Sequence, residues 1–148
     1  MIEPAPTSII DPRLARGIFL ERVEATATQP EYLRLGFPNT DYQLHLIPEG
    51  EQTLPDPGKQ IVGTIHAQAQ RIDMIHAGGR YLEPVFGVPR RVQGRVIAVN
   101  GENNEVIVSA GVPIHCHPTD ARQNATDFNP GDFVSMGVEP GAVFCQED

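Results

Sequence analysis

The feature that most constrains this chain is an alternation of apolar and polar residues with a period of two. Successive side chains of a β-strand point to opposite faces, so this alternation is typical of strands that are buried on one side. It recurs in the segments VEATA, YLRLGF, YQLHLI, QIVGTIHAQAQRIDMIH, GRYLEPVFG, RVQGRVIAV, NEVIVSAG and DFVSMGV. The 14 glycines and 14 prolines fall mostly between these runs, where they predict turns. The sequence therefore predicts an all-β fold of short antiparallel strands with little helix.

The beginning of the chain contains one candidate helix, in the segment DPRLARGIFLERV at residues 11–23. Asp11 could cap this helix and Pro12 could occupy its first position. Gly17 weakens the helix because glycine has a low helix propensity. We expect residues 1–16 to form an N-terminal arm or a short helix ahead of the strands.

An internal similarity suggests that the chain contains two related halves. Matching segments recur in the same order and at one constant offset along the chain: Arg22-Val23-x-Ala25 with Arg95-Val96-x-Ala98, Leu33-x-Leu35 with Val106-x-Val108, and Pro57-Gly58-x-x-Ile61 with Pro130-Gly131-x-x-Val134. YQLHLIP also resembles VPIHCHP after a three-residue gap. Any two β-meanders share alternation and Pro-Gly turns, so one continuous sheet remains the alternative. A duplication would give two small β-barrels, over residues 17–88 and 89–148.

Residues 92–145 contain the motifs GRVIAV, NEVIVSAG and NPGDFVSMGVEPGAVF, the last of which begins a strand at Pro-Gly-Asp. In this order they resemble an OB-like five-stranded barrel, in particular the small TOBE-like domains that follow some transport ATPases. The resemblance covers about a third of the chain. It implies a compact antiparallel barrel that binds a small oxyanion, a sugar or an oligonucleotide on one face. The motifs carry over an architecture but no binding residue.

The net charge of −8 is distributed unevenly. Residues 1–58 and 96–148 carry net charges of −5 and −7, whereas residues 59–95 carry +4. The candidate ligand-binding arginines lie in this basic segment: Arg71, Arg80, Arg90, Arg91 and Arg95. In an extended strand Arg91 and Arg95 share a face and could bind phosphates. Nucleic acid is a possible partner, but the net charge of −8 and the scarcity of aromatic residues, at 6%, disfavour it. We therefore favour pairing of these arginines with the acidic ends, within one chain or between copies.

The segment GVPIHCHPTD holds three side chains that can bind metals. In a strand His115 and His117 point to one face and Cys116 to the other, so the histidines could chelate a metal without the cysteine. The same geometry excludes Cys116 as a nucleophile activated by these histidines. The first further ligand that we consider is His45, which matches His115 in the repeat; the others are His66, His76, Asp120 and Asp127. We favour the alternative of a strand that exposes two polar histidines and buries Cys116 as a small apolar residue.

The order of HCH and NPGD also resembles that of cupins, but the likeness is incomplete. The acidic ligand of that family would have to be Asp120, which comes too early, and no histidine follows NPGD. The sequence also lacks the CxxC, Walker, Gly-x-Ser-x-Gly and Gly-x-Gly-x-x-Gly motifs. We therefore expect no cofactor and no catalytic residue.

These patterns together predict a non-catalytic, cytoplasmic binding or assembly module that associates with itself or with another protein through strand edges and complementary charges. The two cysteines are too few for a disulfide framework, and no apolar run approaches the ~20 residues of a membrane helix. The first residues lack the layout of a signal peptide. Two alternatives remain: a barrel that binds single-stranded nucleic acid or an oxyanion through the arginine row, and a metal-dependent enzyme that uses the His-Cys-His strand.

Overall fold

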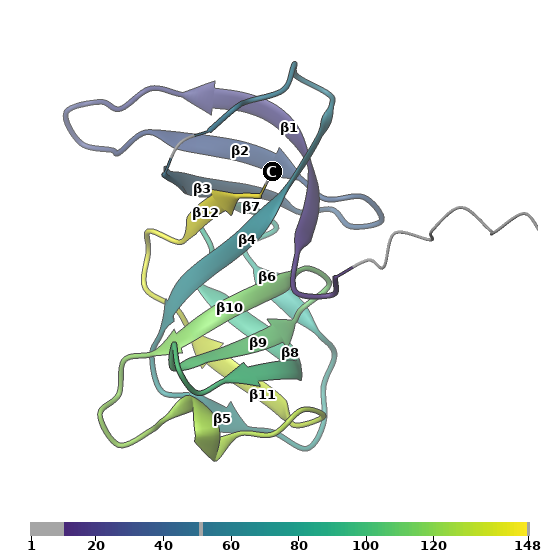
Figure 1. The fold of residues 1–148 in the computed structure, drawn as a ribbon, viewed down its shortest axis with the longest axis vertical. Coiled ribbons are helices and arrows are strands. Elements are labelled where there is room, and N and C mark those ends of the chain that lie inside the picture. The colour runs from purple at the N-terminus through teal and green to yellow at the C-terminus, as the bar shows by residue number, and fades with distance from the viewer. Residues whose placement is uncertain (1–10, 51, 148) are drawn as a thin grey trace, which may run out of the picture.

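The computed structural model describes residues 11–50 and 52–147, and it confirms the predicted all-β fold with little helix (Figure 1). Within these residues the strands are β1 (Ala15–Val23), β2 (Tyr32–Gly36), β3 (Gln43–Glu49), β4 (Gln60–Ala69), β5 (Asp73–Met74), β6 (Tyr81–Glu83), β7 (Phe86–Gly87), β8 (Arg91–Asn100), β9 (Glu105–Ser109), β10 (Pro113–Pro118), β11 (Phe133–Gly137) and β12 (Val143–Gln146). The single helix described is the short 3-10 helix η1 (Ala125–Asp127). No helix in this part of the chain is long and apolar enough to span a membrane.

The helix considered for residues 11–23 does not form, because β1 occupies most of this segment. Burial in β1 alternates, with Ala15 and Phe19 directed into the core, and the strand pairs with β2 and β4. A period-two burial pattern and two hydrogen-bonding neighbours favour the extended conformation over a helix that contains a glycine. Residues 1–10 of the predicted arm lie outside the described residues.

Five strands form a first ring in the order β1, β2, β3, β12 and β4, and pairing of β1 with β4 closes it. Alternate residues of these strands are fully buried, among them Leu33 and Leu35 in β2 and Leu44 and Leu46 in β3. Phe144 of β12 is buried with them in one hydrophobic core. The ring is therefore completed by a strand from the end of the chain.

The pairing of the first ring recurs in a second set of strands. Leu33 pairs with Leu46 between β2 and β3, and Val106 pairs with Cys116 between β9 and β10. The remaining pairs of the two ladders correspond in the same order: Arg34–His45 with Ile107–His115, Leu35–Leu44 with Val108–Ile114, and Gly36–Gln43 with Ser109–Pro113. The two ladders thus have the same register.

A β-bulge recurs as well, after Phe19 in β1 and after Val96 in β8. The bulges and the register match Phe19 with Val96 and Arg22 with Val99, so the predicted match of Arg22 with Arg95 is wrong. The reason is the connection that follows each strand. The turn between β8 and β9, residues 101–104, is shorter than the loop between β1 and β2, residues 24–31.

Each set of strands is closed by a strand from the other half of the chain. β12 lies between β3 and β4, and the end of β4 lies beside β10 and bridges through Ala69 to Val138, after β11. Figure 1 shows β4 passing from the group that contains β1–β3 to the group that contains β8–β11. These insertions make β12–β3 and β4–β10 parallel, and β3–β7 is parallel too, so the expectation of antiparallel strands alone is wrong. The predicted segments 17–88 and 89–148 therefore share strands.

Gly94 provides a test of how closely β8 and β9 approach each other. A Cβ atom at this position would overlap the carbonyl oxygen of Ser109, which is backbone and cannot move aside cheaply. We expect Gly94→Ala to lower the free energy of unfolding by about 1–3 kcal/mol, as overpacking does. The matched control is Gly79→Ala, where nothing lies within 4 Å of the added atom. In urea unfolding this control should change the free energy of unfolding by less than about 0.5 kcal/mol. Equal effects of the two substitutions would contradict the observed packing.

Candidate metal centre

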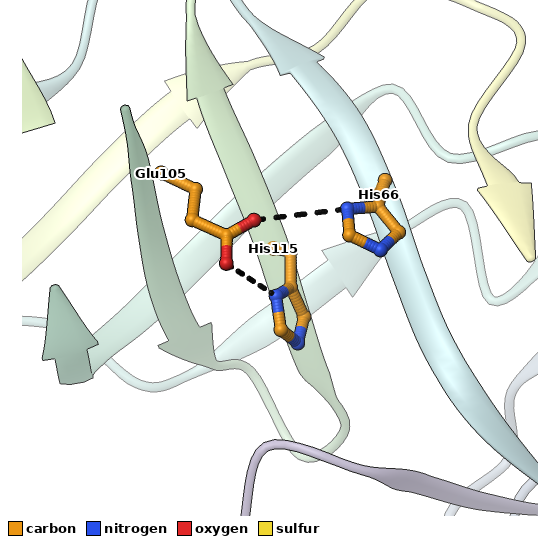
Figure 2. Close-up of side chains that lie close together, drawn as sticks. All are labelled: His66, Glu105 and His115. Carbon is orange, nitrogen blue, oxygen red and sulfur yellow. Dashed lines mark ion pairs between the residues drawn. The ribbon is translucent and has the colours of Figure 1, made fainter. Parts of the chain in front are cut away.

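Three neighbouring strands bring four polar side chains to one face of the sheet. In the parallel pairing of β4 with β10, His66 lies opposite His115. In the antiparallel pairing of β9 with β10, Cys116 lies opposite Val106, which places Glu105 beside His117. Directly opposed residues of adjacent strands point to the same face. Figure 2 shows His66, Glu105 and His115 converging in this way.

The polar atoms of this cluster have the spacing of metal ligands. One ligand atom from each of His66, Glu105 and His115 lies within 4.8 Å of the others. Glu105 Oε1 is 3.3 Å from His115 Nδ1, and Glu105 Oε2 is 3.4 Å from His117 Nε2 and 3.8 Å from His66 Nδ1. His66 Nδ1 and His117 Nε2 are 2.9 Å apart. Ligand atoms around a tetrahedral zinc ion with bonds of about 2.0–2.2 Å lie roughly 3.3–3.6 Å from one another, which is the spacing of Glu105 from His115 and His117. The 2.9 Å hydrogen-bond distance between His66 and His117 would have to lengthen for all four groups to share one ion.

The hydrogen bond between His115 and the backbone determines which ring nitrogen faces the cluster. His115 Nε2 lies 3.0 Å from the carbonyl oxygen of Arg13, which can only accept, so Nε2 must carry the proton. In the neutral ring Nδ1 then presents a lone pair to the Glu105 carboxylate. The two atoms are close, yet Nδ1 is buried and has no hydrogen-bond partner among the described residues. Two facing acceptors repel each other unless a proton or a metal ion lies between them.

His66 is held in a similar manner by a neighbour on its own strand. Its Nε2 is 2.8 Å from the Thr64 hydroxyl, which leaves Nδ1 on the side of Glu105 and His117. Histidines that bind metals usually engage the other ring nitrogen with a carbonyl, a carboxylate or water, which fixes the ring orientation. The contacts of His66 and His115 with Thr64 and Arg13 fit this arrangement, although Thr64 contributes a hydroxyl.

Burial favours the neutral form of the histidines at the rim of the cluster. Burial is the main cause that lowers the pKa of His66, the nearby His115 and His117 rings lower it further, and Glu105 opposes the shift. Burial likewise lowers the pKa of His117, against the opposing effect of Glu105. A neutral imidazole is the form that binds a metal, so these shifts keep both rings available near neutral pH.

The centre adjoins a polar cavity of about 510 Å³. Glu105 and His115, whose side chains are only 9% and 6% exposed, both line it. Arg13, Thr64 and Asn100 line it as well. A small molecule in this cavity would therefore contact two of the four candidate ligands.

The structure corrects parts of the interpretation of GVPIHCHPTD. His115 and His117 share a face, but His115 is buried, so the view of two exposed histidines is wrong for His115. Cys116 is fully buried, and burial raises the pKa of its thiol to about 12. His45 does not join this cluster, because β12 and β4 separate β3 from β10 and its ring lies between Tyr32 and Phe86.

Of the other candidate ligands, His66 joins the cluster, His76 is exposed in a loop, and Asp120 and Asp127 are engaged elsewhere. The carboxylate of the cluster was not among the candidates. Asp120 binds Arg122, and Asp127 caps η1. The sequence analysis missed Glu105. The available signal was an acidic residue at the start of the otherwise apolar strand EVIVS, where a buried charge is unusual. Its closeness to His117 requires the register of β9 and β10.

The candidate arginines contact several different partners. On β8, Arg91 donates to the Ser135 hydroxyl, while Arg95 donates to the Gly131 carbonyl and lies over the ring of Phe133. Arg71 forms an ion pair with Asp73. Arg80 is exposed, and Arg90 lines a cavity beside Phe86.

No protein-family model, no curated protein and no solved structure matches this chain. The resemblance of residues 92–145 to TOBE-like domains therefore remains a prediction. The metal centre is inferred from the geometry of the cluster alone.

The tautomer of His115 is directly measurable. We expect NMR of ¹⁵N-labelled, metal-free protein to show a proton on Nε2 of His115, because the Arg13 carbonyl accepts from Nε2. A ring with its only proton on Nδ1 would contradict the proposed orientation, and His76, which lies in a loop, provides an internal reference.

Proposed function

We propose that this chain binds one divalent transition-metal ion, with zinc as the best fit, through His66, Glu105, His115 and His117. The observation that carries the proposal is the buried Nδ1 of His115, which faces a carboxylate oxygen at 3.3 Å with no hydrogen bond while its other nitrogen donates to Arg13. A cation between the two atoms would bond to both of them.

The donor set favours zinc over the hard alkaline-earth ions. Three imidazoles and one carboxylate match the nitrogen and oxygen ligands that zinc takes in a tetrahedral arrangement. Calcium and magnesium prefer oxygen ligands alone. Imidazole also suits copper, nickel and iron, and we place zinc first because four nitrogen and oxygen ligands match its usual coordination number.

We also infer that the chain is an internal duplication of a small OB-like unit. The shared register of β2–β3 and β9–β10, the recurring bulge and the reciprocal closing strands support this interpretation. In this scheme the metal centre belongs to the second unit. His66 reaches it because β4 of the first unit pairs with β10 of the second.

A metal-dependent enzyme is a second candidate function, favoured by the cavity of about 510 Å³ that Glu105 and His115 line. Catalytic zinc sites typically use three protein ligands and keep one position for water or substrate. Three protein ligands would therefore favour a catalytic metal, and four would favour a metal that stabilises the fold. Self-association of a cytoplasmic module remains a prediction.

The first test is metal content and affinity. We expect untagged protein to bind one zinc ion per chain, and excess zinc at 100 times the dissociation constant to raise the free energy of unfolding by about 2.7 kcal/mol. His115→Asn should weaken binding by more than the roughly 10–100-fold that loss of a supporting residue causes. His76→Asn is the matched control and should leave the affinity unchanged. Equal zinc binding by both variants would contradict the assignment.

The second test concerns the fourth ligand. We expect His117→Ala to weaken zinc binding as strongly as His66→Ala, because the nitrogens of both rings lie beside Glu105 Oε2. Isothermal titration of both variants measures this. Retention of stoichiometric zinc by His117→Ala alone would reject a four-ligand centre and identify three ligands with a free position.

A further inference from the structure

The first half of the chain has a cavity at the place that corresponds to the metal centre. The repeated register relates Glu105, His115 and His117 to Tyr32, His45 and Ile47. Continuing the β3–β12 pairing by two residues places Gly141 beside His45, as His66 lies beside His115. These counterparts all line one cavity of about 440 Å³, and they are Tyr32, His45, Ile47 and Gly141. The side chains of isoleucine and glycine supply no ligand atom, so this cavity lacks the donor set for a metal.

Aromatic rings take the place of the metal ligands in this cavity. The rings of Tyr32 and His45 stack with centroids 4.4 Å apart and an interplanar angle of 19°. Phe86 meets His45 edge-on at 5.0 Å and is 52% exposed. The guanidinium of Arg34 lies 5.6 Å from the centre of the Phe86 ring. Phe86 is exposed and Tyr32 and His45 are half-buried, and aromatic rings with a cation beside one of them offer a surface on which a planar ring can stack.

The polar atoms of His45 support a ligand of this kind. Burial is the first cause that lowers the pKa of His45, followed by the charge of Arg34, so the ring is neutral near pH 7. Its Nε2 is buried and has no hydrogen-bond partner among the described residues. A buried polar atom without a partner is costly, and a ligand with polar ring atoms offers it one.

A second cavity of about 480 Å³ adjoins the first and shares Val88 with it. Phe86 lines this second cavity together with Arg90 and Arg91, and the one carboxylate in its lining is Glu83. The lining therefore carries one positive charge in excess, in a chain whose net charge is −8. Guanidinium groups bind phosphate oxygens well, often through two hydrogen bonds.

We propose that these two adjoining cavities bind a nucleotide, with the base against Tyr32, His45 and Phe86 and the phosphate near Arg90 and Arg91. The aromatic cavity supplies stacking surface and the arginine cavity supplies charge, which are the two elements of sequence-tolerant recognition of unpaired nucleotides. The ligand is either a free nucleotide or one nucleotide of a single strand. Both have the same base and phosphate, and the experiment separates them.

The test uses the full chain with two kinds of probe. A fluorescein-labelled dodecamer of uridine is titrated by anisotropy, and adenosine and uridine monophosphates are titrated by NMR. We expect Phe86→Ala to weaken binding at least about fivefold through lost stacking. Arg90→Gln should weaken binding of the oligonucleotide and reduce the magnitude of its salt dependence by about 0.7 in the logarithmic slope.

The chain provides a matched pair of controls. Arg95 lies over Phe133 at 5.4 Å, which is a second arginine–phenylalanine pair away from these cavities, so Phe133→Ala and Arg95→Gln should leave binding unchanged. Phe86 and Arg90 are exposed, and unfolding midpoints of the variants confirm that the fold is intact. His115→Asn should also leave nucleotide binding unchanged, which makes this test independent of the metal centre.

Each outcome decides the proposal. Binding of both probes, weakened by Phe86→Ala, supports a nucleotide site that a free nucleotide can fill. Binding of the dodecamer alone, with the same sensitivity, supports a site for a single strand. Failure of every probe to bind with a dissociation constant below about 1 mM overturns the proposal, as does binding that Arg95→Gln abolishes and Phe86→Ala leaves intact.

Discussion

The parallel pairing of β4 with β10 is the constraint on which both the fold and the proposed metal centre depend. β4 is ten residues long, and its first part pairs with β1 while its last part lies beside β10. This crossing brings β4 beside the second set of strands and places His66 directly opposite His115. A strand confined to one half of the chain would leave the histidines of β10 with Glu105 alone.

The electrostatics of the cluster follow from this placement. Glu105 and His115 are buried side by side, and a buried carboxylate is costly unless opposite charge or hydrogen bonds compensate it. The Arg13 carbonyl and the Thr64 hydroxyl engage the outer nitrogens of His115 and His66, so the inner nitrogens turn toward the carboxylate. A divalent ion at this point satisfies all of these groups at once. The corresponding cavity of the first half is lined by Ile47 and Gly141 at two of these positions, so it does not gather the polar groups that a divalent ion would compensate.

The strands were predictable from the sequence because each one is buried on one side, and period-two alternation reports that directly. The shared face of His115 and His117 followed from the same rule. His66 was only one of several further candidates and Glu105 was not considered, because the closeness of both to the histidines of β10 depends on a register and on a strand exchange between halves. The helix expected at Asp11 failed for a related reason, since pairing of β1 with β2 and β4 outweighs a local capping pattern. A repeat was predicted, and the shorter turn after β8 displaces one of the predicted matches.

The most direct measurement is a crystal structure of zinc-loaded protein with anomalous diffraction recorded on both sides of the zinc absorption edge. We predict one peak per chain, at about 2.0–2.2 Å from Nδ1 of His66 and His115, Nε2 of His117 and an oxygen of Glu105. The hydrogen bond from His115 Nε2 to the Arg13 carbonyl should persist. An absence of zinc at this cluster, with zinc bound elsewhere or nowhere, would contradict the assignment.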